Sequence, residues 1–142
     1  MAKRILVPVE TAHDSGAVAV AGAVAREHGA TVRLLRVVPV PQRVVGPHGR
    51  TIAYVDQEME RLTAEGLREL ELAEAPLHGV PVESIVRFGE PVEEILLEAD
   101  AFDADLIAVA TSRRHRLARA ARPDVADRVL HASPIPVLLV RE

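Results

Sequence analysis

The sequence lacks cysteine altogether and has very few aromatic residues. Without cysteine the chain cannot form a disulfide, use a thiol as a nucleophile or hold zinc or an iron–sulfur cluster through thiolates. Tyr54, Phe88 and Phe102 are the only aromatic side chains, so there is no row of rings on which single-stranded bases could stack. These absences exclude thiol chemistry and cysteine-bound metal centres, and they argue against a single-strand nucleic-acid binder.

Long hydrophobic runs and an excess of one charge are missing too. The longest purely apolar run, Ala17–Ala25, is much shorter than the ~20 residues that a membrane-spanning helix needs. Pro8 and Glu10 interrupt the apolar start of the chain before the hydrophobic region of a signal peptide could form. The net charge of −4, from 17 basic and 21 acidic residues, excludes a globally basic nucleic-acid binder. We therefore expect one cytoplasmic domain over residues 1–142 with no membrane partner.

The chain instead contains short apolar segments that alternate with helical patterns. Segments rich in Val, Ile and Leu predict five buried strands, at residues 5–9, 31–38, 80–87, 105–110 and 136–140. Apolar residues at steps of three and four predict helices over 14–28, 55–77, 92–101 and 124–132. Pro76 is expected to end or bend the second of these helices, which puts Leu77 beyond its regular part. Residues 39–51 carry three prolines and two glycines without periodicity, which indicates a loop. This alternation predicts an α/β domain with one doubly wound parallel sheet, helices on both faces and right-handed crossovers.

Ligands of such folds bind beyond the carboxyl ends of the strands, where the winding direction reverses. In this sequence the segments at that edge are 10–14, 37–41, 89–91 and 110–124. The last of them contains a basic stretch without any acid, formed by Arg113, Arg114, His115, Arg116, Arg119 and Arg122. Glu83, Glu93 and Glu94 are expected to face solvent rather than to form a catalytic pair. The six histidines form no metal-binding spacing, so we expect no metal site.

Three segments of the sequence resemble the universal stress protein family. They are Ile5-Leu-Val-Pro-Val-Glu10, Gly89-Glu-Pro-Val-Glu-Glu-Ile95, and Ala104–Ala110 continuing to Val125-Ala-Asp-Arg-Val-Leu130 and Ser133-Pro-Ile-Pro-Val-Leu-Leu-Val140. The resemblance covers essentially the whole chain in register. It implies a flavodoxin-like (adenine nucleotide α-hydrolase-like) sheet with strand order 3-2-1-4-5. It also implies a non-catalytic homodimer, paired through the last strand, that acts in the response to stress.

Family members that bind ATP are similar to one another in a glycine motif, G-x2-G-x9-G-(S/T), directly after the fourth strand. In this chain the matching positions are Ala110, Arg113, Pro123 and Asp124. The family's aspartate near the adenosine pocket corresponds to Glu10, and Val37 matches the position that usually lies near adenine. The resemblance therefore implies a degenerate nucleotide site formed by Glu10, Val37, Ala110, Arg113, Arg114, Pro123 and Asp124.

Each departure from the motif opposes a bound phosphate. Ala110 adds a methyl group where the backbone should approach the ligand, and Arg113 removes a glycine's freedom to take positive φ. Pro123 has no N–H to donate. Asp124 can cap its helix by accepting from the N–H of Ala126 or Asp127, which puts a carboxylate where phosphate would bind. An unpaired charge about 4 Å from a phosphate costs up to about 4 kcal/mol at an effective dielectric constant of 20. We therefore expect no cofactor.

The arginine-rich stretch leaves other ligands open. Arginine binds phosphate well, so ATP or another small anion held by the basic loop Arg113–Arg122 is the alternative, in a nucleotide-binding regulator or weak ATPase. Exposed arginines also pair with glutamates of a neighbouring helix or subunit, or simply face water. Nucleic acid bound by this loop is a third reading, and it predicts affinity that falls steeply with salt. The non-catalytic homodimer that the resemblance implies would instead act through a protein partner that the sequence does not identify.

The predicted last strand has a hydrophobic edge. Proline is tolerated at strand starts and edges, and here Pro134 and Pro136 precede an apolar run. A bare apolar edge would invite uncontrolled pairing, so the two-fold pairing implied by the family is a controlled solution. The expected dimer interface is formed by Pro136, Val137, Leu138, Leu139 and Val140.

Overall fold

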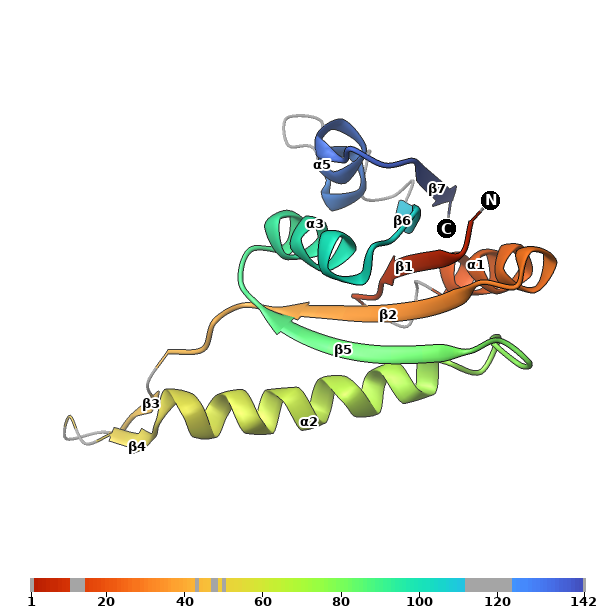
Figure 1. The fold of residues 1–142 in the computed structure, drawn as a ribbon. Coiled ribbons are helices and arrows are strands. Elements are labelled where there is room, and N and C mark those ends of the chain that lie inside the picture. The colour runs from red at the N-terminus through yellow and green to blue at the C-terminus, as the bar shows by residue number, and fades with distance from the viewer. Residues whose placement is uncertain are drawn as a thin grey trace.

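The computed structural model describes residues 2–10, 15–42, 44–46, 49, 51–111 and 124–141. The elements follow in chain order as β1 (Arg4–Pro8), α1 (Ser15–His28), β2 (Thr31–Val38), β3 (Val44–Val45), β4 (Thr51–Ala53), α2 (Val55–Ala73), β5 (Val82–Phe88), α3 (Pro91–Phe102), β6 (Leu106–Thr111), α5 (Val125–Ala132) and β7 (Val137–Arg141). Figure 1 shows these elements around a central sheet. All five predicted strands and all four predicted helices are present, within a few residues of the predicted bounds.

The central sheet is parallel and has the order β5-β2-β1-β6-β7. Counted over its own five strands, this is the order 3-2-1-4-5 that the resemblance implied. β1 is in the centre. From β1 the chain winds outward to β2 and β5 on one side, then crosses back to β6 and β7 on the other side, so the winding direction reverses at β1. The carboxyl ends of β1, β2 and β6 therefore meet at the switch point, which is the edge where ligands bind in folds of this class.

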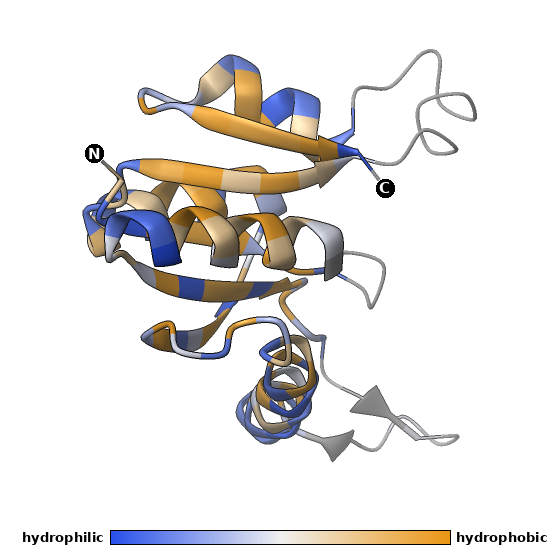
Figure 2. Cartoon of the chain, turned by 90° about the vertical axis from the view of Figure 1, so that its right-hand side faces the viewer, coloured by the Kyte–Doolittle hydropathy of each residue, from blue (hydrophilic) through white to orange (hydrophobic). Residues whose placement is uncertain are grey.

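Two hydrophobic clusters hold helices on opposite faces of the sheet. Alternate residues of a strand point to opposite faces, so Ile5 and Val7 pack with α1 and α2 whereas Leu6 packs with α3 and α5. Leu70 of α2 belongs to the first cluster, and Val129 of α5 belongs to the second. Figure 2 shows the strands between these helices coloured mostly as hydrophobic residues. In the part of the chain that the structure describes, no helix is long and apolar enough to cross a membrane.

Helix ends follow the sequence signals. Gly29, directly after α1, has a φ of +66°, the left-handed conformation that favours glycine after a helix. α2 ends at Ala73, before Pro76, so Leu77 lies beyond the regular helix, as the position of the proline predicted. Leu77 still contributes to the core, because it is buried in the first hydrophobic cluster. Arg26 of α1 fixes this connection by donating to the carbonyl oxygens of Pro76 and His78, at 2.6 and 3.0 Å.

The prediction of a plain loop over residues 39–51 was wrong. β3 and β4 pair there as a short antiparallel hairpin, in which Val44 is opposite Ala53 and Val45 is opposite Thr51. The strands have two and three residues, which is too short for a periodic pattern to be read from the sequence. In Figure 1 this hairpin and the first turns of α2 extend past the carboxyl ends of β2 and β5.

Candidate functional site

The predicted site residues that the structure describes lie at or near the carboxyl edge of the sheet. Glu10 follows β1 and is exposed, Val37 is the next-to-last residue of β2, and Ala110 is the next-to-last residue of β6. Val37 and Ala110 are half-buried and pack against the two hydrophobic clusters. Asp124 directly precedes α5. Arg113, Arg114 and Pro123 lie outside the described residues, as does the rest of the arginine-rich stretch.

Asp124 caps α5 as the sequence predicted. Its Oδ1 accepts a hydrogen bond of 2.8 Å from the backbone N–H of Asp127, and its Oδ2 accepts one of 3.2 Å from the hydroxyl of Thr111. Asp124 and Thr111 are 8% and 4% exposed. The carboxylate is therefore buried at the helix N-terminus and anchored to the end of β6. A group held in this way already provides the negative charge that a helix N-terminus would otherwise take from a bound anion.

A second carboxylate caps α3 in the same manner. Glu90 Oε2 accepts a hydrogen bond of 2.8 Å from the backbone N–H of Glu93, and its Oε1 forms an ion pair of 2.8 Å with Arg128 of α5. The N–H of Glu93 and then the Arg128 guanidinium lower the pKa of the Glu90 carboxyl, against the opposing effect of burial. The N-terminal ends of α3 and α5 are thus joined by one bridge.

Arg36 ties the end of β1 to α2. Its guanidinium donates to the backbone carbonyl oxygen of Glu10 and lies 3.6 Å from the carboxylate of Glu69 on α2. Gly66 makes room for this packing, because a Cβ there would lie 3.5 Å from Cγ of Arg36 and 2.9 Å from Cγ2 of Val86. The positive charge of Arg36 is therefore paired with acceptors of the same chain.

Taken together, the described part of this edge is acidic and internally paired. Glu10, Glu90 and Asp124 lie along it, and the two helix N-termini of α3 and α5 are filled by side-chain oxygens. Sequence reasoning found Glu10 and Asp124 but missed Thr111, Glu90, Arg128 and Arg36. A signal for Glu90 was present, because it precedes a proline at the first position of a helix, where a cap is expected. Thr111 and Arg36 act through contacts that only the fold creates.

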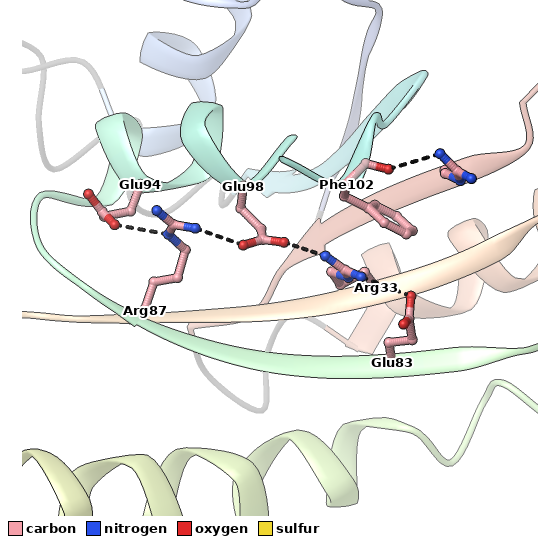
Figure 3. A network of polar contacts seen from close by, with 7 residues as sticks. Arg33, Glu83, Arg87, Glu94, Glu98 and Phe102 are labelled. Atoms are coloured by element: carbon pink, nitrogen blue, oxygen red, sulfur yellow. Dashed lines mark hydrogen bonds and ion pairs between the residues drawn. The ribbon is translucent and has the colours of Figure 1, made fainter. Parts of the chain in front are cut away.

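A second polar cluster lies between α3 and the sheet, away from this edge. Glu98 of α3 binds Arg33 of β2 at 2.6 Å and Arg87 of β5 at 2.9 Å (Figure 3). Arg87 also binds Glu94 at 2.9 Å, and Arg33 also binds Glu83 at 3.1 Å. Glu83 and Glu93 are exposed as expected, although Glu83 also pairs with Arg33, whereas the expectation that Glu94 faces solvent was wrong, because Arg87 holds it in a mostly buried ion pair. We call these five residues the Glu98 network.

Burial and pairing act together on the two arginines of this network. Burial alone would lower the pKa of Arg33, but the hydrogen bonds that it donates to Glu98 and Glu83 raise that pKa above its ordinary value. The hydrogen bonds that Arg87 donates to Glu94 and then to Glu98 raise the pKa of Arg87.

The described residues include no group of three or more His, Asp or Glu that could hold a metal ion. The polar clusters of the described chain are thus ion pairs and caps.

Comparisons with known proteins agree with this architecture. A model of the universal stress protein family matches residues 1–141. Among solved structures, hypothetical protein MJ0577 superposes with a TM-score of 0.74 at 26% identity, with 99% of this chain and 96% of that chain covered. None of the curated proteins compared with the sequence gives a significant match.

Two similar structures contain nucleotides. A universal stress protein in complex with cAMP has a TM-score of 0.72 at 22% identity and covers 98% of this chain and 97% of its own. The universal stress protein from Archaeoglobus fulgidus in complex with dAMP has a TM-score of 0.63 at 20% identity, with 97% of both chains covered. At these identities the similarity establishes the fold.

Proposed function

Because the chain belongs to the universal stress protein family, we propose that it is a non-catalytic, cytoplasmic stress-response domain that works as a homodimer. We further propose that it does not bind ATP in the way implied by the family's glycine motif. Its biological output then comes from contacts of the dimer with a protein partner. The observation that carries this proposal is the Asp124 carboxylate, which fills the N-terminus of α5.

The electrostatics of the edge support the loss of the phosphate site. A phosphate at the N-terminus of α5 would have to displace a buried carboxylate from the N–H of Asp127 and from Thr111. The displaced carboxylate would then lie beside another anion. This arrangement is unfavourable, because like charges a few ångströms apart repel strongly in a partly buried site. The Glu90 carboxylate on the neighbouring helix adds negative charge to the same edge. Arg128 is partly neutralised by that carboxylate.

The relatives supply the ligands for a test. Because similar proteins were solved with cAMP and dAMP, an adenine nucleotide is the appropriate probe. We expect the unmodified protein to give no saturable heat with AMP in calorimetry. Asp124→Asn keeps a capping oxygen but removes the charge. If the carboxylate excludes phosphate, this variant should bind AMP at least about tenfold more tightly, a change of about 1.4 kcal/mol.

The matched control is Asp100→Asn, which removes an exposed carboxylate of α3 that does not cap a helix. It should leave AMP binding unchanged. Micromolar affinity of the unmodified protein would contradict the proposal and favour nucleotide binding through the arginine-rich stretch. In that case Arg113→Ala and Arg114→Ala should each weaken binding steeply.

The dimer proposal rests on the difference between the two edge strands of the sheet. At one edge, β5 carries Glu83 and Arg87 and is packed against α2, which lies beside it in Figure 1. Charged side chains protect an edge strand from pairing. At the other edge, β7 is apolar apart from its last residue, Arg141, and Leu139 in its middle is 37% exposed. A second copy of this chain at β7, in contact with residues 136–140, would cover that leucine.

Charge placed at this edge tests the dimer. We expect Leu139→Lys to convert the protein to a monomer at micromolar concentration, because two copies of the new lysine would face each other across the two-fold axis. Light scattering gives the mass. Leu72→Lys is the control, since Leu72 is 81% exposed on α2 and lies far from β7 in sequence. A monomeric unmodified protein, or a Leu139→Lys dimer, would disprove pairing through β7.

A further inference from the structure

The outer face of α1 is apolar until the last turn of the helix. Residues 16–25 are glycine, alanine and valine only, and Ala19, Val20 and Ala23 among them are exposed. Val20 is the largest of the three and is 36% exposed. The exposed face of α2 instead carries charged side chains such as Glu60. A helix that is apolar on its outer side as well is typically covered by another surface.

Val20 lies on the side of α1 that faces β7. Residues two positions apart point to nearly opposite sides of a helix, because successive residues are about 100° apart around its axis. Gly22 faces the connection between α2 and β5, where a Cβ on it would lie 2.9 Å from Cδ2 of Leu77, and Arg26 binds the same connection. Val20 and Val24 therefore point away from β5. Since β5 and β7 form the two edges of the sheet and α1 contacts β7, they point toward the β7 edge.

Leu130 of α5 lies at the same edge on the other face of the sheet. It is 43% exposed, and Arg128, two residues earlier, points to α3 because it pairs with Glu90. Leu130 therefore faces away from α3. α3 packs on β1 and β2 whereas α5 packs on β6 and β7, so this direction leads to the β7 edge. Leu139 is on the same face, since Val137, two residues before it in the strand, belongs to the second hydrophobic cluster.

Leu130 and Leu139 also lie at the same level along the strand. Asp124 is hydrogen-bonded to Thr111, which is opposite Arg141 in the register of β6 and β7. A helix rises about 1.5 Å and a strand about 3.3 Å per residue. Leu130, six residues after Asp124, is therefore about 9 Å from that end of the sheet, and Leu139, two residues before Arg141, is about 7 Å from it.

The same reasoning places Val20 at this level on the opposite face. α1 ends at His28, beside the amino edge of the sheet where β2 pairs with Arg4 of β1. Val20 is eight residues before His28, which is about 12 Å along the helix. The registers of β1, β6 and β7 put Leu139 four residues past the level of Arg4, about 13 Å along the strand. Three exposed apolar side chains thus surround the middle of β7.

The backbone of β7 gives the position of a two-fold axis. The N–H of Ile107 in β6 donates to the carbonyl oxygen of Pro136, so the backbone groups of residue 136 point to β6. Backbone groups alternate in direction along a strand, and those of Val137, Leu139 and Arg141 therefore point outward. An antiparallel second copy uses all three when Leu139 is opposite its own copy. The axis then passes beside Leu139, at the level of Val20 and Leu130.

We propose that the contact between two copies has three layers, with Val20 of α1 on one face of the sheet, β7 in the middle and Leu130 of α5 on the other face. This inference rests on the proposed pairing through β7. A strand of five residues is about 17 Å long in a sheet about 10 Å thick, which is far less than the ~800 Å² per partner of a stable interface. The two helices supply further apolar area, and at the axis each of their side chains meets its own copy.

Lysine at either helix position tests this three-layer contact. We expect Val20→Lys and Leu130→Lys each to raise the dissociation constant of the dimer by about tenfold or more, because two copies of the new charge would meet at the axis. Sedimentation equilibrium measures this constant. The matched controls are Ala19→Lys, on the exposed face of α1 but turned away from β7, and Leu97→Lys, at an exposed leucine of α3. Both controls should dimerise as tightly as the unmodified protein.

The absence of cysteine allows a second test that does not depend on weakening the dimer. In Val20→Cys and Leu130→Cys proteins the single thiol is expected to lie near its own copy. A short bifunctional thiol reagent should then join each of these variants into a covalent dimer on a denaturing gel. Leu97→Cys, which is exposed away from β7, should stay monomeric on the same gel. Absence of covalent dimers at positions 20 and 130 would overturn the three-layer contact, and a different protein on this surface would give that result.

The Leu139→Lys variant separates the three-layer contact from the dimer itself. If the unmodified protein is a monomer, or Leu139→Lys remains a dimer, pairing through β7 is wrong and the three-layer contact is wrong with it. If Leu139→Lys is a monomer while Val20→Lys or Leu130→Lys dimerises like the unmodified protein, pairing through β7 stands and the three-layer contact alone is overturned. Weaker dimers from both helix variants, with both controls unchanged, would support it.

Discussion

Two carboxylates, Asp124 and Glu90, cap the helices that begin at the carboxyl edge of the sheet. Asp124 could be predicted as a cap, because aspartate is a preferred residue at that position and its partner Asp127 is three residues away. Glu90 could not be predicted with the same assurance, since glutamate is not among the preferred caps. Its ion-pair partner Arg128 is 38 residues away in sequence. Local rules therefore predict the first carboxylate firmly and the second weakly, and only the fold reveals the ion pair of the second.

Glu98 shows the limit of pattern reasoning at single positions. Hydrophobic periodicity predicts that Val92, Ile95, Leu96 and Ala99 form the inner face of α3; Val92, Ile95 and Ala99 are buried, and Leu96 is half-buried. It could not predict a buried carboxylate, because burial of Glu98 depends on Arg33, which is 65 residues away. Buried charges are tolerated only when they are paired, and the pairing partner is a property of the sheet.

The Glu90–Arg128 bridge predicts a specific dependence of stability on pH. The pKa of Glu90 is lower in the folded protein than its unfolded value of about 4.3. Its stabilising contribution is therefore fully present above the unfolded pKa, and it is lost as pH falls through the folded pKa. Glu90→Gln should lower the melting temperature at pH 7 and have a smaller effect at pH 3. A thermal shift series over this range, with the exposed Glu60→Gln as control, measures the difference. An effect of equal size at both pH values would contradict the bridge.

At the scale of elements, strands and helices were predicted well because each is long enough to show a period. The five strands of the central sheet are rich in Val, Ile and Leu, with β1 the most deeply buried, and the helices between them carry apolar stripes. The β3–β4 hairpin was missed because two and three residues cannot show a period. The end of α2 was signalled by Pro76. Leu77 continues the apolar stripe of that helix although it lies in the turn after it, where it also reaches the core.

The packing of α2 against the sheet leads to a prediction about Gly66. A methyl group there would lie 2.9 Å from Cγ2 of Val86, which is too close for a half-buried, stiff side chain. Alanine favours a helix over glycine by about 1 kcal/mol, but overpacking typically costs about 1–3 kcal/mol. We therefore expect Gly66→Ala to destabilise the domain in urea denaturation. A double-mutant cycle with Val86→Ala should show coupling between the two positions. A more stable Gly66→Ala protein would show that α2 is not held by this close approach.

At the scale of the whole molecule, the order of the strands decides which residues can act together. The parallel arrangement brings the ends of β1, β2 and β6 to one edge, so Glu10, Val37 and Ala110 lie near it although they are far apart in sequence. Sequence alternation predicts such a sheet, and the family resemblance gives its strand order. Neither predicts the polar contacts at this edge, because Thr111, Arg36 and Arg128 bind residues of other elements that lie far away in sequence.

The most direct test of this account is a calorimetric titration of the purified, unmodified protein with Mg-ATP at low salt, where electrostatic binding is strongest. With the Asp124 carboxylate at the N-terminus of α5, we expect no saturable heat up to millimolar ATP. That result would direct the search for function to the dimer surface and its protein partners. A dissociation constant in the micromolar range would contradict the account, and it would mean that side chains bind the nucleotide in place of the glycine motif.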